Sequence, residues 1–160
     1  MLEAWVDLED LRDKASDELP GFNDRLTAWL PTMIEHRCSI GHRGGFFERL
    51  RRGTYMAHIM EHVCLELQSL AGSEVGYGRT RETAVDGVYK VAIEYIEEGF
   101  AKEAVRSAVA LCMAAVHGHA FDVHAEVDKL RKILTKRSPG SQHQFDGPSR
   151  TSARHSDAPP

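Results

Sequence analysis

The sequence contains few cysteines, and those it has lack the close spacing of a disulfide framework. Only Cys38, Cys64 and Cys112 occur among 160 residues. An odd number of widely spaced cysteines, two of them within apolar helical patterns, is typical of reduced thiols and excludes a disulfide-rich secreted domain. The chain also lacks a basic, apolar leader and any apolar run as long as a bilayer span. We therefore expect a cytoplasmic protein without a membrane anchor.

An excess of positive charge is missing as well. Lys and Arg number 20 and Asp and Glu number 24, which gives a formal net charge of -4. This balance leaves no electrostatic footprint for a nucleic acid or an anionic membrane, so we expect neither as a partner. The 42% of hydrophobic residues is enough for the core of one domain, and the 28% of charged residues supplies its surface.

Leu, Ile and Val are absent from Ser138 to the end of the chain, where Ser, Pro, Gly, His and Asp dominate. Such a segment cannot bury enough apolar surface to offset the entropy lost on ordering. The sequence therefore predicts one folded domain over residues 1–136 and a disordered tail over 137–160.

Hydrophobic periodicity predicts an α+β fold. Alternation over Leu2–Leu8 predicts an edge strand, and the run Val88–Glu97 predicts a second strand, paired in a hairpin with the region Val75–Thr83. Helical spacing indicates helices over 22–30, from about Phe46 or Gly53 to Leu70, over 99–116 and over 123–134. Together these elements predict a small antiparallel sheet covered by three to four helices.

One motif with metal chemistry lies in the helix that ends at Leu70. His58, Glu61 and His62 form His-x-x-Glu-His, in which two histidines one helical turn apart can reach one ion. The adjacent Glu61 could then act as general base on a water whose pKa the metal lowers to about 7. A catalytic zinc site needs three protein ligands, and the best acidic candidates for the third are Glu66 and Glu94. The cofactor would be Zn or another divalent metal.

Other interpretations of the same residues stay open. A helical wheel places His58, Glu61 and His62 opposite the apolar side, so we expect them to face away from the main core, partly covered because Leu65 lies among them. A polar helix face in a chain with nine histidines also needs no metal to explain it. A further soft-ligand cluster could form within the loop 36–42, which contains two histidines and Cys38.

Arginines flank the Gly44-Gly45 pair and could pair with carboxylates through bidentate contacts. They are Arg43, Arg49, Arg51 and Arg52. Carboxylates that could pair with guanidinium groups are Glu94, Glu97 and Glu98. The alternative is that both sets are ordinary solvated surface.

The order of several short segments resembles the N-terminal domain of cyanophycin synthetases. The segments are Arg43-Gly44-Gly45-Phe46, Gly53-Thr54, His58 with Glu61-His62-Val63, Gly78-Arg79-Thr80-Arg81-Glu82-Thr83 and Gly87-Val88-Tyr89. An ordered set over about sixty residues is far more specific than a single motif. Similarity extends more loosely from Val6 to Leu134.

The resemblance implies a role in cyanophycin metabolism. Full cyanophycin synthetases are cytoplasmic ATP-dependent ligases that extend a poly-aspartate chain and attach arginine to its side chains. Their ATP-grasp and Mur-ligase-like domains perform these additions, and the N-terminal domain holds the polymer. In some members this domain also resembles a metallopeptidase that cuts the polymer to make primers, and His58, Glu61 and His62 match that region position by position.

This sequence contains no Gly-rich ATP-binding loop and no Mur-type phosphate loop, so we expect no ATP site and no ligase activity from this chain. Three functions remain. The chain could bind or tether cyanophycin, with separate ligase domains as partners. It could be a metal-dependent hydrolase of the polymer, or it could be a non-functional remnant of a truncated synthetase.

Overall fold

The structure, a computed structural model, describes residues 1–137. It contains one antiparallel sheet in the order β1-β3-β2, formed by β1 (Leu2–Asp7), β2 (Gly78–Glu82) and β3 (Val88–Ile93). The α-helices are α1 (Phe22–Trp29), α2 (Gly45–Arg51), α3 (Met56–Leu70), α4 (Glu98–His117) and α5 (Val123–Arg137). The predicted α+β class with a small antiparallel sheet and covering helices is confirmed. Residues 138–160, assigned above to a tail, lie outside the described residues.

The sheet follows from the alternation seen in the sequence. The residues of β1 alternate between partly buried and exposed positions, as expected for a strand with one face on a core. Strand β3 lies between the other two, and both Leu2 and Gly78 stand opposite Ile93. The predicted edge strand and hairpin are therefore both present.

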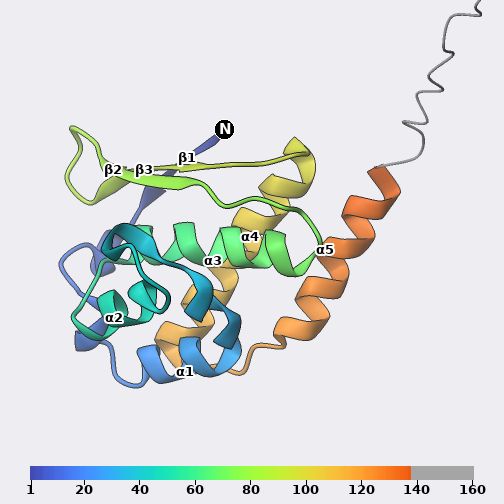
Figure 1. The fold of residues 1–160 in the computed structure, drawn as a ribbon. Coiled ribbons are helices and arrows are strands. Elements are labelled where there is room, and N and C mark those ends of the chain that lie inside the picture. Colours follow the sequence, from blue (N-terminus) through green and yellow to red (C-terminus); the bar gives the residue numbers. More distant parts are fainter. Residues whose placement is uncertain (138–160) are drawn as a thin grey trace, which may run out of the picture.

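Helix α3 is the centre of the fold. It contacts β2 and β3 on one side, and it packs against α4 and α5 as well. Figure 1 shows the sheet above α3, with α4 passing behind it and α1 and α2 below it. The three phenylalanines among the largest fully buried side chains, Phe22, Phe46 and Phe100, come from α1, α2 and α4.

The structure divides one predicted helix into two. The periodicity allowed a helix from Phe46 or Gly53 to Leu70, whereas α2 ends at Arg51 and α3 begins at Met56. Gly53 has φ +91°, a left-handed conformation that favours glycine and that no α-helix can contain. The break lets α2 fold back beside α3 instead of extending it.

The motif lies on a partly covered side of α3 that lines a cavity, as expected, but it is covered more deeply than the helical wheel indicated. The side of α3 that carries it is covered by α2 and by two short 3₁₀ helices, η3 (Pro31–Glu35) and η4 (Cys38–Ile40), and the Phe46 ring lies 4.2 Å from the His62 ring, centre to centre. Under this cover His62 is only 7% exposed, and Glu61, which packs against β2, is only 6% exposed. The wheel identified the polar side of the helix but not the segments that cover it. No helix among the described residues has the length and hydrophobicity needed to cross a membrane.

Candidate functional site

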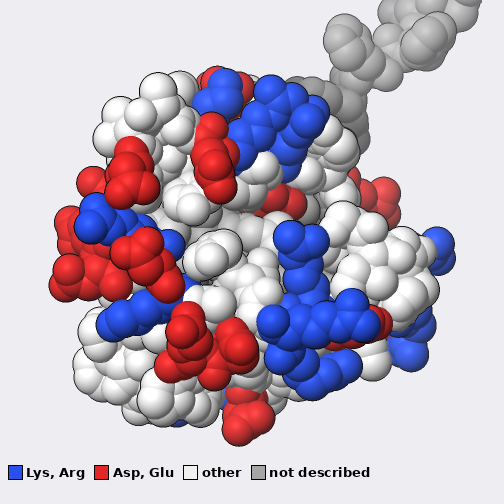
Figure 2. All heavy atoms as spheres, turned by 90° about the vertical axis from the view of Figure 1, so that its left-hand side faces the viewer, with Lys and Arg blue, Asp and Glu red and all other residues white. Residues whose placement is uncertain are grey.

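A cavity of about 1220 Å³ lies between α3, the edge strand β2 and the segment 32–39. Charged side chains of both signs line it, namely Glu35, Arg37, Arg49, Glu61, Glu66, Arg79, Arg81 and Glu82. On the face of the molecule shown in Figure 2, basic and acidic side chains are interspersed around a hollow rather than segregated. The cavity therefore presents no single charge sign to a ligand.

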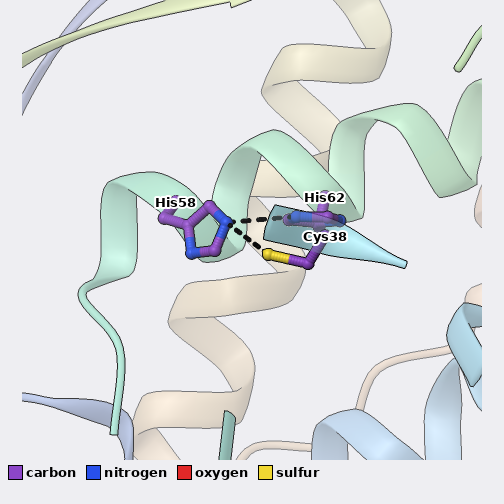
Figure 3. Close-up of side chains that lie close together, drawn as sticks. All are labelled: Cys38, His58 and His62. Atoms are coloured by element: carbon purple, nitrogen blue, oxygen red, sulfur yellow. Dashed lines mark hydrogen bonds between the residues drawn. The ribbon is translucent and has the colours of Figure 1, made fainter. Parts of the chain in front are cut away.

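Two histidines and one cysteine converge on the wall of this cavity. Helix α3 places His58 and His62 one turn apart, with their Nε2 atoms 3.1 Å from each other. The Sγ atom of Cys38, carried by η4, lies 3.4 Å from His58 Nε2 (Figure 3). One ligand atom from each of the three residues falls within 4.8 Å of the others. On the opposite ring nitrogen, His58 Nδ1 lies 2.9 Å from the Thr54 hydroxyl oxygen, which orients the ring.

A second chain of contacts orients His62. Its Nδ1 atom lies 2.9 Å from His36 Nδ1, and His36 Nε2 lies 2.9 Å from Glu66 Oε2. The Thr32 hydroxyl donates to the other oxygen of Glu66. Outer contacts of this kind fix the orientation of histidine ligands in metal sites. Glu66 therefore lies behind His36 rather than beside the Nε2 atoms, and it is not the third member of the cluster.

The donor set fits zinc. Burial lowers the pKa of His58 to about 4 and that of His62 to about 2, with the nearby Arg49 charge adding to both shifts. Both rings are thus neutral near pH 7, which is the form that binds a metal. Cysteine sulfur and histidine nitrogen are ligands that zinc prefers, a catalytic zinc site uses three protein ligands, and these three residues line the cavity.

The Glu61 side chain extends from α3 toward β2. Its Oε2 atom accepts a hydrogen bond of 2.6 Å from the Thr80 hydroxyl. A Cβ atom at Gly78 would come within 2.6 Å of Glu61 Cγ, so the glycine makes room for this carboxylate. Burial raises the pKa of Glu61 although the bond from Thr80 opposes the shift, and this direction is the one that suits a carboxyl group to act as a general base.

Glu94, the other predicted third ligand, has a different role. Its carboxylate accepts hydrogen bonds of 2.9 Å from the backbone N–H groups of Gly76 and Tyr77, which lower its pKa. It holds the segment that leads into β2 and does not line the cavity. Cys38 completes the cluster instead. The sequence placed Cys38 in a separate loop cluster, because nothing local shows that η4 packs against α3.

Only one of the four predicted polymer-binding arginines lines the cavity. Arg49 donates to the Ser39 hydroxyl at 2.8 Å and belongs to the cavity wall. Arg43 and Arg52 form ion pairs with glutamates, and Arg51 is exposed on α2 outside the lining.

The other cavity arginines were not predicted as site residues. Arg37 precedes η4, and Arg79 and Arg81 lie on β2. The signal that could have identified Arg79 and Arg81 is the alternation Arg79-Thr80-Arg81 in a predicted strand, which places both arginines on one face. The predicted acidic partners Glu97 and Glu98 lie at the start of α4, where the Glu97 side chain accepts from the backbone N–H groups of Gly99 and Phe100.

Comparison with known proteins identifies similar chains. A family model described as the cyanophycin synthase-like N-terminal domain matches residues 3–117. A cyanophycin synthetase of Crocosphaera subtropica is 58% identical over 142 residues, which cover 87% of this chain and 16% of that protein. One from Synechocystis sp. is 53% identical over 111 residues, covering 69% and 13%. One from Geminocystis herdmanii is 49% identical over 138 residues, covering 86% and 16%. The matches thus span about one sixth or less of the relatives' length.

Proposed function

The chain belongs to the family of cyanophycin synthase-like N-terminal domains, and from this premise we propose that it binds or tethers cyanophycin. The polymer has a poly-aspartate backbone with arginine joined to the side-chain carboxyl groups. Each repeat therefore keeps one free carboxylate and one guanidinium group. A site that holds it needs partners for both charges along an extended path.

The charged lining of the cavity is the observation that carries this proposal. Four arginines and four glutamates are distributed over walls from α2, α3, β2 and the segment 32–39. Arginine binds a carboxylate through two parallel hydrogen bonds, and glutamate can do the same for a guanidinium group. A purely acidic or purely cationic ligand would meet repulsion on part of the same surface. The mixed lining therefore favours a ligand that alternates both charges.

Two arginines of α2 offer a matched test. Arg49→Glu and Arg51→Glu make the same change in net charge, but only Arg49 lines the cavity. Loss of one charge-assisted hydrogen bond costs about 1.5–3 kcal/mol, which corresponds to an approximately 10- to 150-fold weaker Kd. We expect that loss for Arg49→Glu and less than a roughly threefold change for Arg51→Glu, measured by calorimetry with a synthetic aspartate–arginine oligomer at low salt. Equal losses in both variants would refute binding in the cavity.

A metal-dependent hydrolase of the polymer is the second candidate. The observation that favours it is the convergence of Cys38, His58 and His62 in a cavity that Glu61 also lines. These three residues would hold Zn²⁺, which when bound polarises a carbonyl group and activates a water. The Glu61 carboxylate would take the proton from that water and deliver it to the leaving amine. Thr80 holds the carboxylate in place for this transfer.

Metal analysis and polymer cleavage separate the two candidates. For the hydrolase we expect metal in the purified wild-type protein, loss of metal and cleavage in His58→Ala, and loss of cleavage alone in Glu61→Gln. Cleavage that persists in His58→Ala or with a chelator would contradict this mechanism. Retention of the polymer without cleavage in the wild type would leave the binding module, and the absence of both would leave a non-functional remnant.

A further inference from the structure

The backbone hydrogen bonds of β2 reveal which of its groups face the cavity. Beyond the strand ends, the N–H of Glu94 donates to the carbonyl of Tyr77 at 2.9 Å, and the N–H of Thr83 donates to the carbonyl of Val88 at 3.2 Å. Both pairs continue the β2–β3 register, in which Gly78 stands opposite Ile93. In an antiparallel pair, hydrogen-bonded and non-hydrogen-bonded positions alternate. The odd-numbered residues of β2 therefore bond to β3.

The even-numbered residues point the other way. The N–H and C=O groups of Gly78, Thr80 and Glu82 face the free edge of the sheet, because β3 uses the odd positions of β2. The Glu61 carboxylate interacts with the Thr80 backbone as well as with its hydroxyl, which agrees with a backbone donor on this side. A five-residue edge of about 17 Å thus carries main-chain groups without a partner strand.

This edge lies inside the cavity. Every residue from Val75 to Glu82 lines it, and the opposite wall is formed by the segment 32–39 with Arg49. The free edge of β1 is different, since its residues do not line the cavity and its outward Glu3 pairs with Lys90 at 2.8 Å. Charged side chains at an exposed edge are a common protection against strand addition unless the added strand carries complementary charges. The β2 edge carries Arg79, Arg81 and Glu82.

We propose that the free edge of β2 takes the poly-aspartate backbone of the polymer as an added strand. This inference rests on the proposed function and specifies how the ligand is held. Main-chain hydrogen bonds at Gly78 and Glu82, and at the carbonyl of Thr80, whose N–H already donates to Glu61, fix an extended segment of about five residues. The side groups of that segment alternate between the two faces of the sheet. One set faces α3, and the other meets Arg79 and Arg81, which line the same cavity from the opposite face of the sheet.

The charges of β2 favour this occupant over a second copy of the same strand. Register places Arg79 opposite Ala92 and Arg81 opposite Lys90 on the exposed face of the sheet. Pairing two β2 edges would bring two arginine rows together on that face, and like charges on neighbouring strands are destabilising. The free carboxylates of the polymer meet the same row with attraction.

Replacement of one backbone donor tests the proposal. Glu82→Pro removes an N–H that faces the cavity and that β3 does not use, and proline is tolerated at such edge positions. Glu82→Gln removes the same charge, keeps the N–H, and serves as the matched control. We expect Glu82→Pro to bind the aspartate–arginine oligomer about 5- to 10-fold more weakly than Glu82→Gln, from one lost hydrogen bond and the bulk of the ring. Circular dichroism should show the same fold in both variants.

An oligomer with alternate backbone N-methyl groups provides an independent arm on the wild-type protein. It should bind more weakly than the unmodified oligomer, and the penalty should shrink in Glu82→Pro. If neither change affects binding while Arg49→Glu still weakens it, the polymer is held by side chains alone; the added strand is then refuted and the proposed function stands. If the wild type binds no oligomer, both fail. A dimer of the free protein that dissociates in Glu82→Pro would overturn the proposal by showing a second copy on the edge.

Discussion

Replacing Gly78 with alanine tests whether Glu61 is positioned by the close packing of α3 against β2. The added Cβ would come within 2.6 Å of Glu61 Cγ and 2.9 Å of its Cδ, closer than real Cβ contacts. Glu61 cannot simply turn away, because it is buried and its Oε2 atom is bonded to Thr80. Either the side chain leaves that bond or the strand shifts away from the helix.

Inserting one methyl group into a packed site costs about 1–3 kcal/mol, and a lost hydrogen bond costs about 1 kcal/mol. We expect Gly78→Ala to lower the free energy of unfolding by about 2 kcal/mol and the Tm by about 8 °C. Gly76→Ala is the control in the same segment, since nothing lies within 4 Å of its added Cβ. It should stay within about 1 kcal/mol of the wild type.

Urea denaturation followed by circular dichroism gives these values, provided that the slope with denaturant is unchanged. The double variant Gly78→Ala/Glu61→Ala removes the atoms that collide, so it should recover about 1 kcal/mol or more relative to the sum of the single changes. Equal stability of Gly78→Ala and Gly76→Ala, or strict additivity in the double variant, would refute the assigned packing.

Three other predictions follow from the described residues. The pKa values of His58 and His62, lowered by burial to about 4 and about 2, lie below the ordinary histidine value, so the unfolded chain binds protons first as the pH falls. The free energy of unfolding should therefore decline below about pH 6.5 by up to about 1.4 kcal/mol per pH unit for each histidine. In urea titrations at several pH values, the free energy of unfolding of a His58→Gln variant should decline less steeply than that of the wild type. Glu97→Ala removes the side-chain cap of α4 and should cost about 1 kcal/mol in a thermal melt, whereas no loss would contradict the cap. Iodoacetamide should label Cys38, which lies on the cavity wall, in the native protein. It should label Cys64 only after unfolding, because burial raises the pKa of this thiol to about 12. Mass spectrometry that finds Cys64 labelled before Cys38 would contradict this arrangement.

Local patterns were sufficient for most of the fold. Period-two alternation predicted β1, and helical spacing predicted α1, α4 and α5, because a strand or helix that packs on one core must repeat its apolar residues with its own period. The division between α2 and α3 was less certain from the sequence. It depends on the left-handed Gly53, and a glycine within a helical pattern does not show whether it breaks the helix.

Only part of the site was predictable, because spacing within one helix can be read from the sequence and contacts between separate elements cannot. His58, Glu61 and His62 belong to one helix, so their mutual placement depends on spacing alone. Cys38 comes from another element, and the third ligand was therefore predicted as Glu66 or Glu94. Both glutamates are acidic residues near the motif in sequence or in a neighbouring strand, but proximity of that kind does not give the direction of a side chain.

The sequence by itself determined the helix that carries His58 and His62, and its ordered segments determined the family. Helical geometry is local, because hydrogen bonds four residues apart fix which side chains share a face. Only the tertiary structure decided that Cys38 joins this pair and that Glu61 lies against Gly78. It also placed the free edge of β2 inside a charged cavity. Those contacts join residues 17 to 20 positions apart, and their formation depends on how the whole chain packs around α3 rather than on any local preference.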